Sequence, residues 1–402
     1  MFSASTLSLR LNSFWLLIAR LTTQGLAVAF IALVARRLEP ASFGQFTFIA
    51  TIVFIGNTFT SFGTDSLLIR EVARSGQIPP LVHRALTLQL VLSALFCFAL
   101  IMFRVNAPLL IYSLSLFPLA IFSIVSALLR GLERMDLFWG ISVAIGLLQI
   151  LFALFASDLL TLCILLLIGN SLTSFIAMRI FSFLEADSGL LPLLDFRPLL
   201  PIALPFAALT IFSVILQRLG ILSIWMLIND TATGQFSSAA RILDGMKFGH
   251  YAVLGALLPM ISRGSFRSQQ NYRLAFTGLF VLSILLAGVA AFFARPILLF
   301  LFGEEYISAV DILGILAWCI VPYTISAFIS VDLVARGKET LLLRSIVISL
   351  LVSIVLYSWC IISFGVEGAS WAALGGEIFQ AVVLLLVRSK SVIESEMMIH
   401  KK

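Results

Sequence analysis

Four cations lie inside long apolar stretches of this sequence, and two of them lie too deep to reach water. Arg218 is about eleven residues from Asn229, or roughly 16 Å at 1.5 Å per residue. Lys247 lies at a similar depth, whereas Arg20 and Arg241 lie roughly 9 Å from the end of their stretches, within reach of the headgroups. A cation at mid-bilayer costs about 2.5–3.5 kcal/mol on insertion scales. Such a residue is usually retained because it faces a wet cavity, so Arg218 and Lys247 predict a site for something negative.

Polar neighbours extend this pair to a set of seven candidate substrate-binding residues. The set is Arg218, Lys247, Arg241, Arg20, Asp244, Gln24 and Gln217. Arg241, Asp244 and Lys247 follow i, i+3, i+6 spacing and lie toward one helix face. Arg offers phosphate a bidentate fork and Lys offers a point charge, so we expect a phosphate-bearing headgroup. The alternative is that Asp244 neutralises Arg241 or Lys247 as a packing pair.

Glu377 is the one acid near the middle of an apolar stretch, about ten residues from Glu367. It is a candidate for coupling transport to protons, and the alternative is a counter-ion for a cation on a neighbouring helix. The sequence has no Gly-rich phosphate loop and no catalytic triad in a loop long enough to fold around it. Its four cysteines and three histidines show no metal-binding spacing. We therefore expect no enzymatic activity, cofactor or metal.

The elements that position these residues are membrane spans. The chain is 61% hydrophobic and only 11% charged, with a mean hydropathy of +1.11, which is too apolar for a soluble core. Runs of about 20 apolar residues predict twelve transmembrane helices. They fall at 14–34, 43–62, 85–103, 108–129, 137–156, 159–183, 202–228, 236–261, 274–302, 307–334, 341–364 and 366–387. The gaps between them leave no room for a soluble domain.

The chain also looks doubled. Gly-Gln-Phe at 44–46 recurs at 234–236, and Val-Leu-Ser at 91–93 recurs at 281–283, both at an offset of 190. Six helices per half predict a parallel repeat about an axis along the membrane normal. We therefore expect an all-α polytopic membrane protein, with twelve transmembrane helices in two pseudo-symmetric six-helix lobes around a central cavity. The lobes are predicted at 1–190 (helices 1–6) and 191–402 (helices 7–12).

Lys and Arg collect on one side of the predicted membrane. With the amino terminus in the cytoplasm, eighteen of the 26 cations lie in cytoplasmic segments and four lie outside. The positive-inside rule then places both termini in the cytoplasm. The net charge of +6 follows from this topology, so no nucleic-acid partner is needed to explain it.

Several segments resemble polysaccharide transporters, the O-antigen flippase (Wzx-type) branch of the MOP superfamily. The segments are 34–46 (VARRLEPASFGQF), 238–242 (SAARI), 301–306 (LFGEEY) and 336–338 (RGK). The resemblance reaches from helix 1 to the start of helix 11. It implies a flippase in the bacterial inner membrane that moves an undecaprenyl-diphosphate-linked oligosaccharide, an O-antigen or exopolysaccharide repeat unit, to the periplasmic leaflet. Expected partners are this lipid-linked substrate, membrane lipids, a polysaccharide polymerase and a chain-length regulator.

Two other function classes remain as alternatives. A small-molecule or drug extruder of the same superfamily is one, although such relatives usually carry an acidic site in the first lobe, where helix 1 offers Arg20 and no carboxylate. A membrane-embedded glycan polymerase or ligase is the other, and it would need a larger outer loop than this sequence contains. Sugar composition, coupling ion, resting orientation and oligomeric state are not defined by the sequence.

Overall fold

The structure is a computed structural model that describes residues 22–75, 81–184, 195–247, 249–250, 253–254 and 266–399. Within these ranges the chain is helical and contains no strand. Arg20 lies outside them, as do parts of the predicted spans 14–34 and 236–261. The described part of the first predicted span, residues 22–34, is helical, and the helix continues to residue 37.

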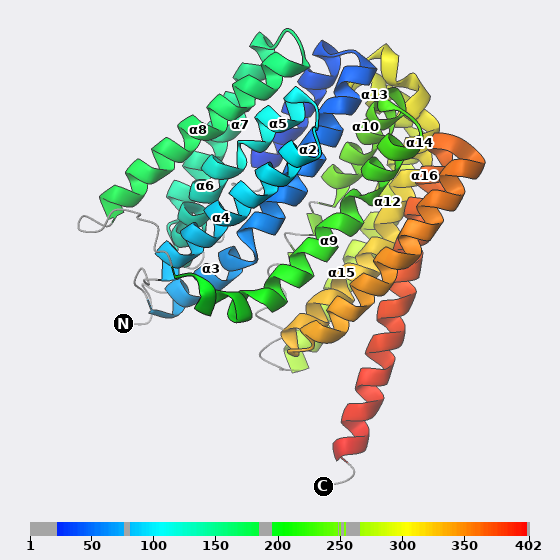
Figure 1. Cartoon of the computed structure of the whole chain (residues 1–402). Helices are drawn as coiled ribbons and strands as arrows, with labels where there is room; N and C mark the ends of the chain where they lie inside the picture. Colours follow the sequence, from blue (N-terminus) through cyan, green and yellow to red (C-terminus); the bar gives the residue numbers. More distant parts are fainter. Residues whose placement is uncertain are drawn as a thin grey trace. The chain divides into compact units, whose positions relative to one another are not determined.

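The chain divides into two compact units, and the first extends to Ile211. After residues 22–37, its helices follow one another with short connections (Figure 1). They are α2 (Pro40–Ser61), α3 (Thr64–Ser75), α4 (Leu81–Met102), α5 (Ala107–Ser113), α6 (Leu116–Gly131), α7 (Met135–Phe155) and α8 (Leu159–Leu184). α2 begins at a proline, whose fixed φ suits the first turn of a helix.

α3 is a helix where the sequence predicted only a loop between two spans. Its apolar side chains recur at helical spacing, and Leu67, Leu68 and Val72 are buried against α6. It was missed because it is too short and too polar for a span. Gly63 makes the turn before it, with φ 70°, and a Cβ there would lie 2.7 Å from the backbone nitrogen of Ala207. Only glycine fits that position without strain.

The second unit runs from Phe212 and contains the remaining helices. They are most of α9 (Leu200–Leu227), α10 (Asp230–Met246), α12 (Phe266–Phe292), α13 (Ala294–Leu301), α14 (Val310–Leu316), α15 (Ile320–Ala335) and α16 (Glu339–Ile399). Three 3-10 segments, η1 (Arg197–Leu199), η2 (Glu304–Ala309) and η3 (Ala317–Cys319), join or extend helices along the chain. α10 and α2 begin 190 residues apart, at the offset of the sequence repeat.

The division between the units falls inside α9, whereas the sequence places the joint between lobes at 190/191. The first turns of α9 pack within the first unit, where Ala207 lies against Gly63 and Phe206 lies under Arg70, whose guanidinium is 5.8 Å from the ring centroid. The later turns pack within the second unit, so one continuous helix contributes to both. The lobe boundary stays a prediction.

α16 contains the last two predicted spans in one element. Gly365 interrupts it with φ 61° and ψ −139°, a left-handed conformation that favours glycine. The two arms then run back along each other, and a Cβ at Gly376 would lie 2.9 Å from the Ser353 hydroxyl. The turn falls between the predicted spans 341–364 and 366–387.

Nine helical segments of the described residues are long and apolar enough to cross a membrane. The count differs from twelve for three reasons: residues 22–37 are too few, α10 has only 17 residues, and the two arms of α16 count as one segment. Large apolar side chains cover the outside of the helices, with Phe103 and Phe292 each 82% exposed. Such surfaces require lipid as solvent, so the all-α polytopic membrane fold is confirmed.

Candidate functional site

α9 and α10 bring three of the predicted site residues together. α10 starts after Asn229, whose side-chain oxygen accepts a hydrogen bond from the backbone N–H of Ala232 at 2.8 Å. This cap fixes where the helix begins, and therefore which face carries the charged series that follows. Gly220 lets α9 approach closely, because a Cβ there would lie 2.8 Å from the Phe236 ring and 2.9 Å from the Tyr357 hydroxyl.

Asp244 bridges two arginines in what we call the Arg-Asp-Arg triad (Arg218, Asp244 and Arg241). Its Oδ2 lies 3.4 Å from Nη1 of Arg218 on α9 and 3.9 Å from Nη1 of Arg241, one turn earlier on α10. Two cations share one carboxylate, so the triad keeps a formal charge of +1. The Asp244 side chain is 42% exposed, and the triad therefore borders open space.

Arg241 makes the longer of the two ion pairs to Asp244, at 3.9 Å against 3.4 Å for Arg218. Its side chain is 26% exposed, and its Nε is buried without a hydrogen-bond partner among the described residues. Asp244 therefore satisfies Arg241 only partly, through a long ion pair. A guanidinium in this position can donate further hydrogen bonds to an oxyanion.

Lys247 belongs to a separate pair. The chain leaves α10 at Lys247, and its Nζ lies 3.2 Å from Oε1 of Glu377 on the second arm of α16 and 4.3 Å from the centroid of the Tyr323 ring. The two charged side chains are 10% and 21% exposed. Glu377 is thus the counter-ion of Lys247, and the pair is formally neutral.

The remaining predicted residues are not brought into these clusters. Gln217 is exposed although it adjoins Arg218, because successive residues on a helix point about 100° apart. Gln24 is half-buried on the helix of residues 22–37 in the first unit. Arg20 lies outside the described residues.

His250 is a buried polar residue that the sequence analysis did not single out. Its Nε2 lies 2.9 Å from the Ser283 hydroxyl and 2.8 Å from the Thr324 hydroxyl, and these two hydroxyls are 2.7 Å apart. The signal was present, since His250 continues the three-residue spacing of Arg241, Asp244 and Lys247. It was overlooked because the three histidines were considered only as possible metal ligands.

The first unit holds a partly buried carboxyl that was also missed. Asp65, at the start of α3, accepts hydrogen bonds from the hydroxyl of Ser123 on α6 and from Nε2 of Gln89 on α4, the latter at 3.4 Å. Burial raises the pKa of the Asp65 carboxyl above its ordinary value. Among the described residues, no group of three or more His, Cys, Asp or Glu side chains could hold a metal ion.

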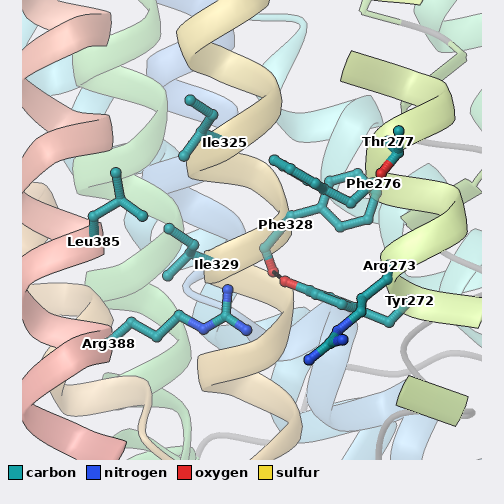
Figure 2. Close-up of a pocket in the computed structure, with 9 residues that line it drawn as sticks. All are labelled: Tyr272, Arg273, Phe276, Thr277, Ile325, Phe328, Ile329, Leu385 and Arg388. Atoms are coloured by element: carbon teal, nitrogen blue, oxygen red, sulfur yellow. Dashed lines mark hydrogen bonds between the residues drawn. The ribbon is translucent and has the colours of Figure 1, made fainter. Parts of the chain in front are cut away.

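A pocket of about 330 Å³ lies between α12, α15 and α16. Figure 2 shows its nine lining residues, and none of the seven predicted binding residues is among them. The lining consists of Tyr272, Arg273, Phe276, Thr277, Ile325, Phe328, Ile329, Leu385 and Arg388.

Solved structures of known transporters share this fold over nearly the whole chain. One is described as MATE in complex with MaL6, with a TM-score of 0.68, 15% identity, and coverage of 96% of this chain and 97% of that chain. Another is an outward-facing multidrug resistance MATE family transporter of the MOP superfamily, with a TM-score of 0.67, 16% identity, and coverage of 96% of this chain and 96% of that chain. A third is a MOP superfamily transporter from Pyrococcus furiosus, whose description reports a reversed polarity of its binding pocket. Its TM-score is 0.70 at 15% identity, with coverage of 94% of this chain and 95% of that chain.

These likenesses show the fold: the chain has the two-lobed, twelve-helix fold of MOP superfamily proteins. No curated protein matches the sequence. The model of the polysaccharide biosynthesis protein family matches residues 9–265, and the chain belongs to that family. The predicted resemblance to polysaccharide transporters of the MOP superfamily is confirmed at the level of family and fold.

Proposed function

We propose that this protein is a flippase for an undecaprenyl-diphosphate-linked oligosaccharide, an O-antigen or exopolysaccharide repeat unit. It moves this substrate from the cytoplasmic to the periplasmic leaflet of the bacterial inner membrane, with both of its termini in the cytoplasm. A family concerned with polysaccharide biosynthesis and a transporter fold support the proposal. The lobes at 1–190 and 191–402 rock against each other, so that a cationic cavity between them opens first to the cytoplasmic side and then to the periplasmic side.

The observation that carries the proposal is the Arg-Asp-Arg triad. It combines a residual formal charge of +1, an exposed side and a buried Nε on Arg241 that has no hydrogen-bond partner among the described residues. A diphosphate supplies the oxygen acceptors that such guanidinium groups bind. An organic cation is repelled by the same charge, which disfavours the drug-extruder alternative.

Lys247 and Glu377 extend the proposal to coupling. A diphosphate that reaches Lys247 competes with Glu377 for the ammonium group, since the pair is held at 3.2 Å and is still partly exposed. Glu377, once released, is a carboxylate inside the membrane without its cation, which makes it the candidate residue for coupling transport to protons. Substrate entry is thereby linked to the state of the Lys247–Glu377 pair.

The test neutralises the triad. Arg218→Gln and Arg241→Gln should each lower transport of a fluorescent polyprenyl-diphosphate oligosaccharide into protein-containing vesicles about tenfold or more, because each removes charge-assisted hydrogen bonds to phosphate. Surface polysaccharide should fall in parallel at unchanged protein level. Arg295→Gln, an exposed cation without an ion pair among the described residues, is the matched control and should retain transport.

Full transport by the double variant Arg218→Gln/Arg241→Gln would overturn the proposal. Increased drug sensitivity of a deletion strain with normal surface polysaccharide would favour the extruder. Glycan chains lengthened by the purified protein alone would favour the polymerase or ligase.

A further inference from the structure

The pocket between α12, α15 and α16 is amphipathic, with its charges gathered at one end. Figure 2 shows the guanidinium groups of Arg273 and Arg388 in the lower part of the view, with Phe276, Ile325 and Leu385 above them. α12, α15 and α16 together supply the charged end and the apolar end of the pocket. A ligand that matches this lining has an anionic head and an apolar chain.

The apolar part of the pocket is a preformed aromatic wall. Phe328 is fully buried, and the rings of Tyr272 and Phe276 meet it edge to face at centroid distances of 5.4 and 5.3 Å. The Tyr272 hydroxyl donates a hydrogen bond to the Phe328 backbone carbonyl at 3.3 Å, which fixes the ring. Leu385 on the opposite wall is 46% exposed, so the pocket is open to its surroundings.

The polar end carries an excess of positive charge. Asp332 is shared by Arg336, at 2.9 Å, and Arg388, at 3.4 Å. Arg273 is exposed and has no carboxylate within 4.0 Å among the described residues. Three cations and one carboxylate leave a formal charge of +2 beside the pocket.

The pocket lies at a membrane border. The predicted spans that line it, 274–302, 307–334 and 366–387, begin or end here, and Arg273, Arg336 and Arg388 lie just beyond their ends. The positive-inside pattern makes this the cytoplasmic border, and the cytoplasmic leaflet is the one that carries anionic lipids. Tyrosine at such a border is typical of the headgroup level.

We propose that this pocket holds an anionic glycerophospholipid of the cytoplasmic leaflet, with its phosphate at Arg273 and Arg388 and one acyl chain along Phe276, Phe328 and Leu385. A volume of about 330 Å³ suits a phosphate, its glycerol and the first part of a chain, and it is small for a diphosphate that carries several sugars. The site is separate from the transport residues, since Arg388 is eleven residues, or roughly 16 Å, beyond Glu377 on α16. The lipid is a resident of the protein and not its cargo.

The experiment measures lipid retention by the full-length protein. Purified protein is mixed with micelles that contain phosphatidylglycerol or phosphatidylcholine, and the bound lipid is counted by native mass spectrometry. Phosphatidylglycerol should bind the wild type at least about fivefold better than phosphatidylcholine, because the two cations favour a net negative headgroup. Arg273→Gln/Arg388→Gln should remove this preference, whereas Arg74→Gln/Arg344→Gln, which deletes two exposed cations elsewhere, should keep it.

A second variant tests the apolar end without changing a charge. Thr277→Phe fills the pocket from α12 and should reduce binding of both lipids, and Arg273→Gln alone serves if the double variant does not fold. Equal binding of the two lipids to the wild type would overturn the proposal. So would displacement of phosphatidylglycerol by equimolar undecaprenyl diphosphate, which would assign the pocket to the transported substrate.

Discussion

The two halves of the chain have corresponding helices, but the side chains at equivalent positions differ in charge. α2 and α10 begin at the same point of the repeat, since Pro40 and Asp230 are separated by its offset. The charged series of α10 has neutral counterparts in α2. Arg241, Asp244 and Lys247 correspond to Thr51, Phe54 and Asn57. Among the described residues, α10 of the second half therefore carries charges that its counterpart α2 lacks, and we expect the anionic part of a ligand to be held in the second half.

The same comparison explains how the charges meet. In the first half, Phe30 packs edge to face on Phe46, with centroids 6.1 Å apart. At the equivalent positions of the second half, Gly220 lies directly against Phe236. Replacing one large side chain by none allows α9 to approach α10 closely, and Arg218 of α9 then reaches Asp244 at 3.4 Å.

The largest effect should come from exchanging these packing residues. Gly220→Phe should prevent accumulation of folded protein, and Gly220→Ala should cost about 1–3 kcal/mol, because its Cβ would overlap the Phe236 ring. Phe30→Ala should cost about 3–5 kcal/mol through the cavity it leaves. Thermal unfolding of the purified proteins measures all three. Wild-type stability of Gly220→Phe would show that close approach of α9 is not required.

A somewhat smaller effect is expected at the buried ion pair of the second half. Lys247→Met leaves Glu377 without its cation and should destabilise the protein by about 3 kcal/mol, the low end for a buried pair, since Glu377 is 21% exposed. Lys247→Met/Glu377→Gln should recover much of this loss. The equivalent Asn57→Met in α2 should change stability much less. If the double variant is no more stable than Lys247→Met, the pair does not act as a unit.

The smallest effect concerns Asp65, a partly buried carboxyl of the first half outside the candidate spans. Its folded-state pKa is raised by burial, so the stability it contributes is full below its unfolded pKa of 3.8 and is lost as pH rises through the folded pKa. The melting temperature of the wild type should therefore fall as pH rises above about 4, and Asp65→Asn should make this fall smaller. Hydrogen bonds from Thr161 lower the pKa of exposed Asp158, so this residue stabilises the fold as pH rises. Asp158→Asn should therefore change the pH dependence of the melting temperature in the opposite direction to Asp65→Asn. Equal slopes for wild type and Asp65→Asn would refute the assignment.

The fold was largely predictable because lipid imposes one simple rule on the sequence. A span needs about 20 apolar residues, and the predicted separation of 341–364 from 366–387 falls at the residue where α16 turns. Breaks within spans were not predictable in this way. α10 ends at Met246 inside the predicted span 236–261, and the span 108–129 is two helices, α5 and α6. Apolar runs define length, whereas such breaks depend on packing between helices.

The candidate site was predicted by residue but not by pairing. Depth alone singled out Arg218 and Lys247, yet the sequence does not show that Asp244 lies nearer Arg218 than Arg241, or that Glu377 reaches Lys247 across 130 residues. Those contacts depend on the approach of α9, α10 and α16. The lipid pocket was missed for the same reason, since its lining comes from three helices and Arg273 and Arg388 resemble ordinary border cations.

Gly365 has a consequence for how the protein is made. Because the chain reverses there within a single short turn, the last two hydrophobic segments form a helical hairpin with no appreciable loop between them. We expect such a hairpin to enter the bilayer as a unit once both of its arms have been synthesised. A chain that stops within the second arm would leave the first without the neighbour it packs against at Gly376 and Ser353, so deletions from the carboxyl terminus should be tolerated only beyond Arg388.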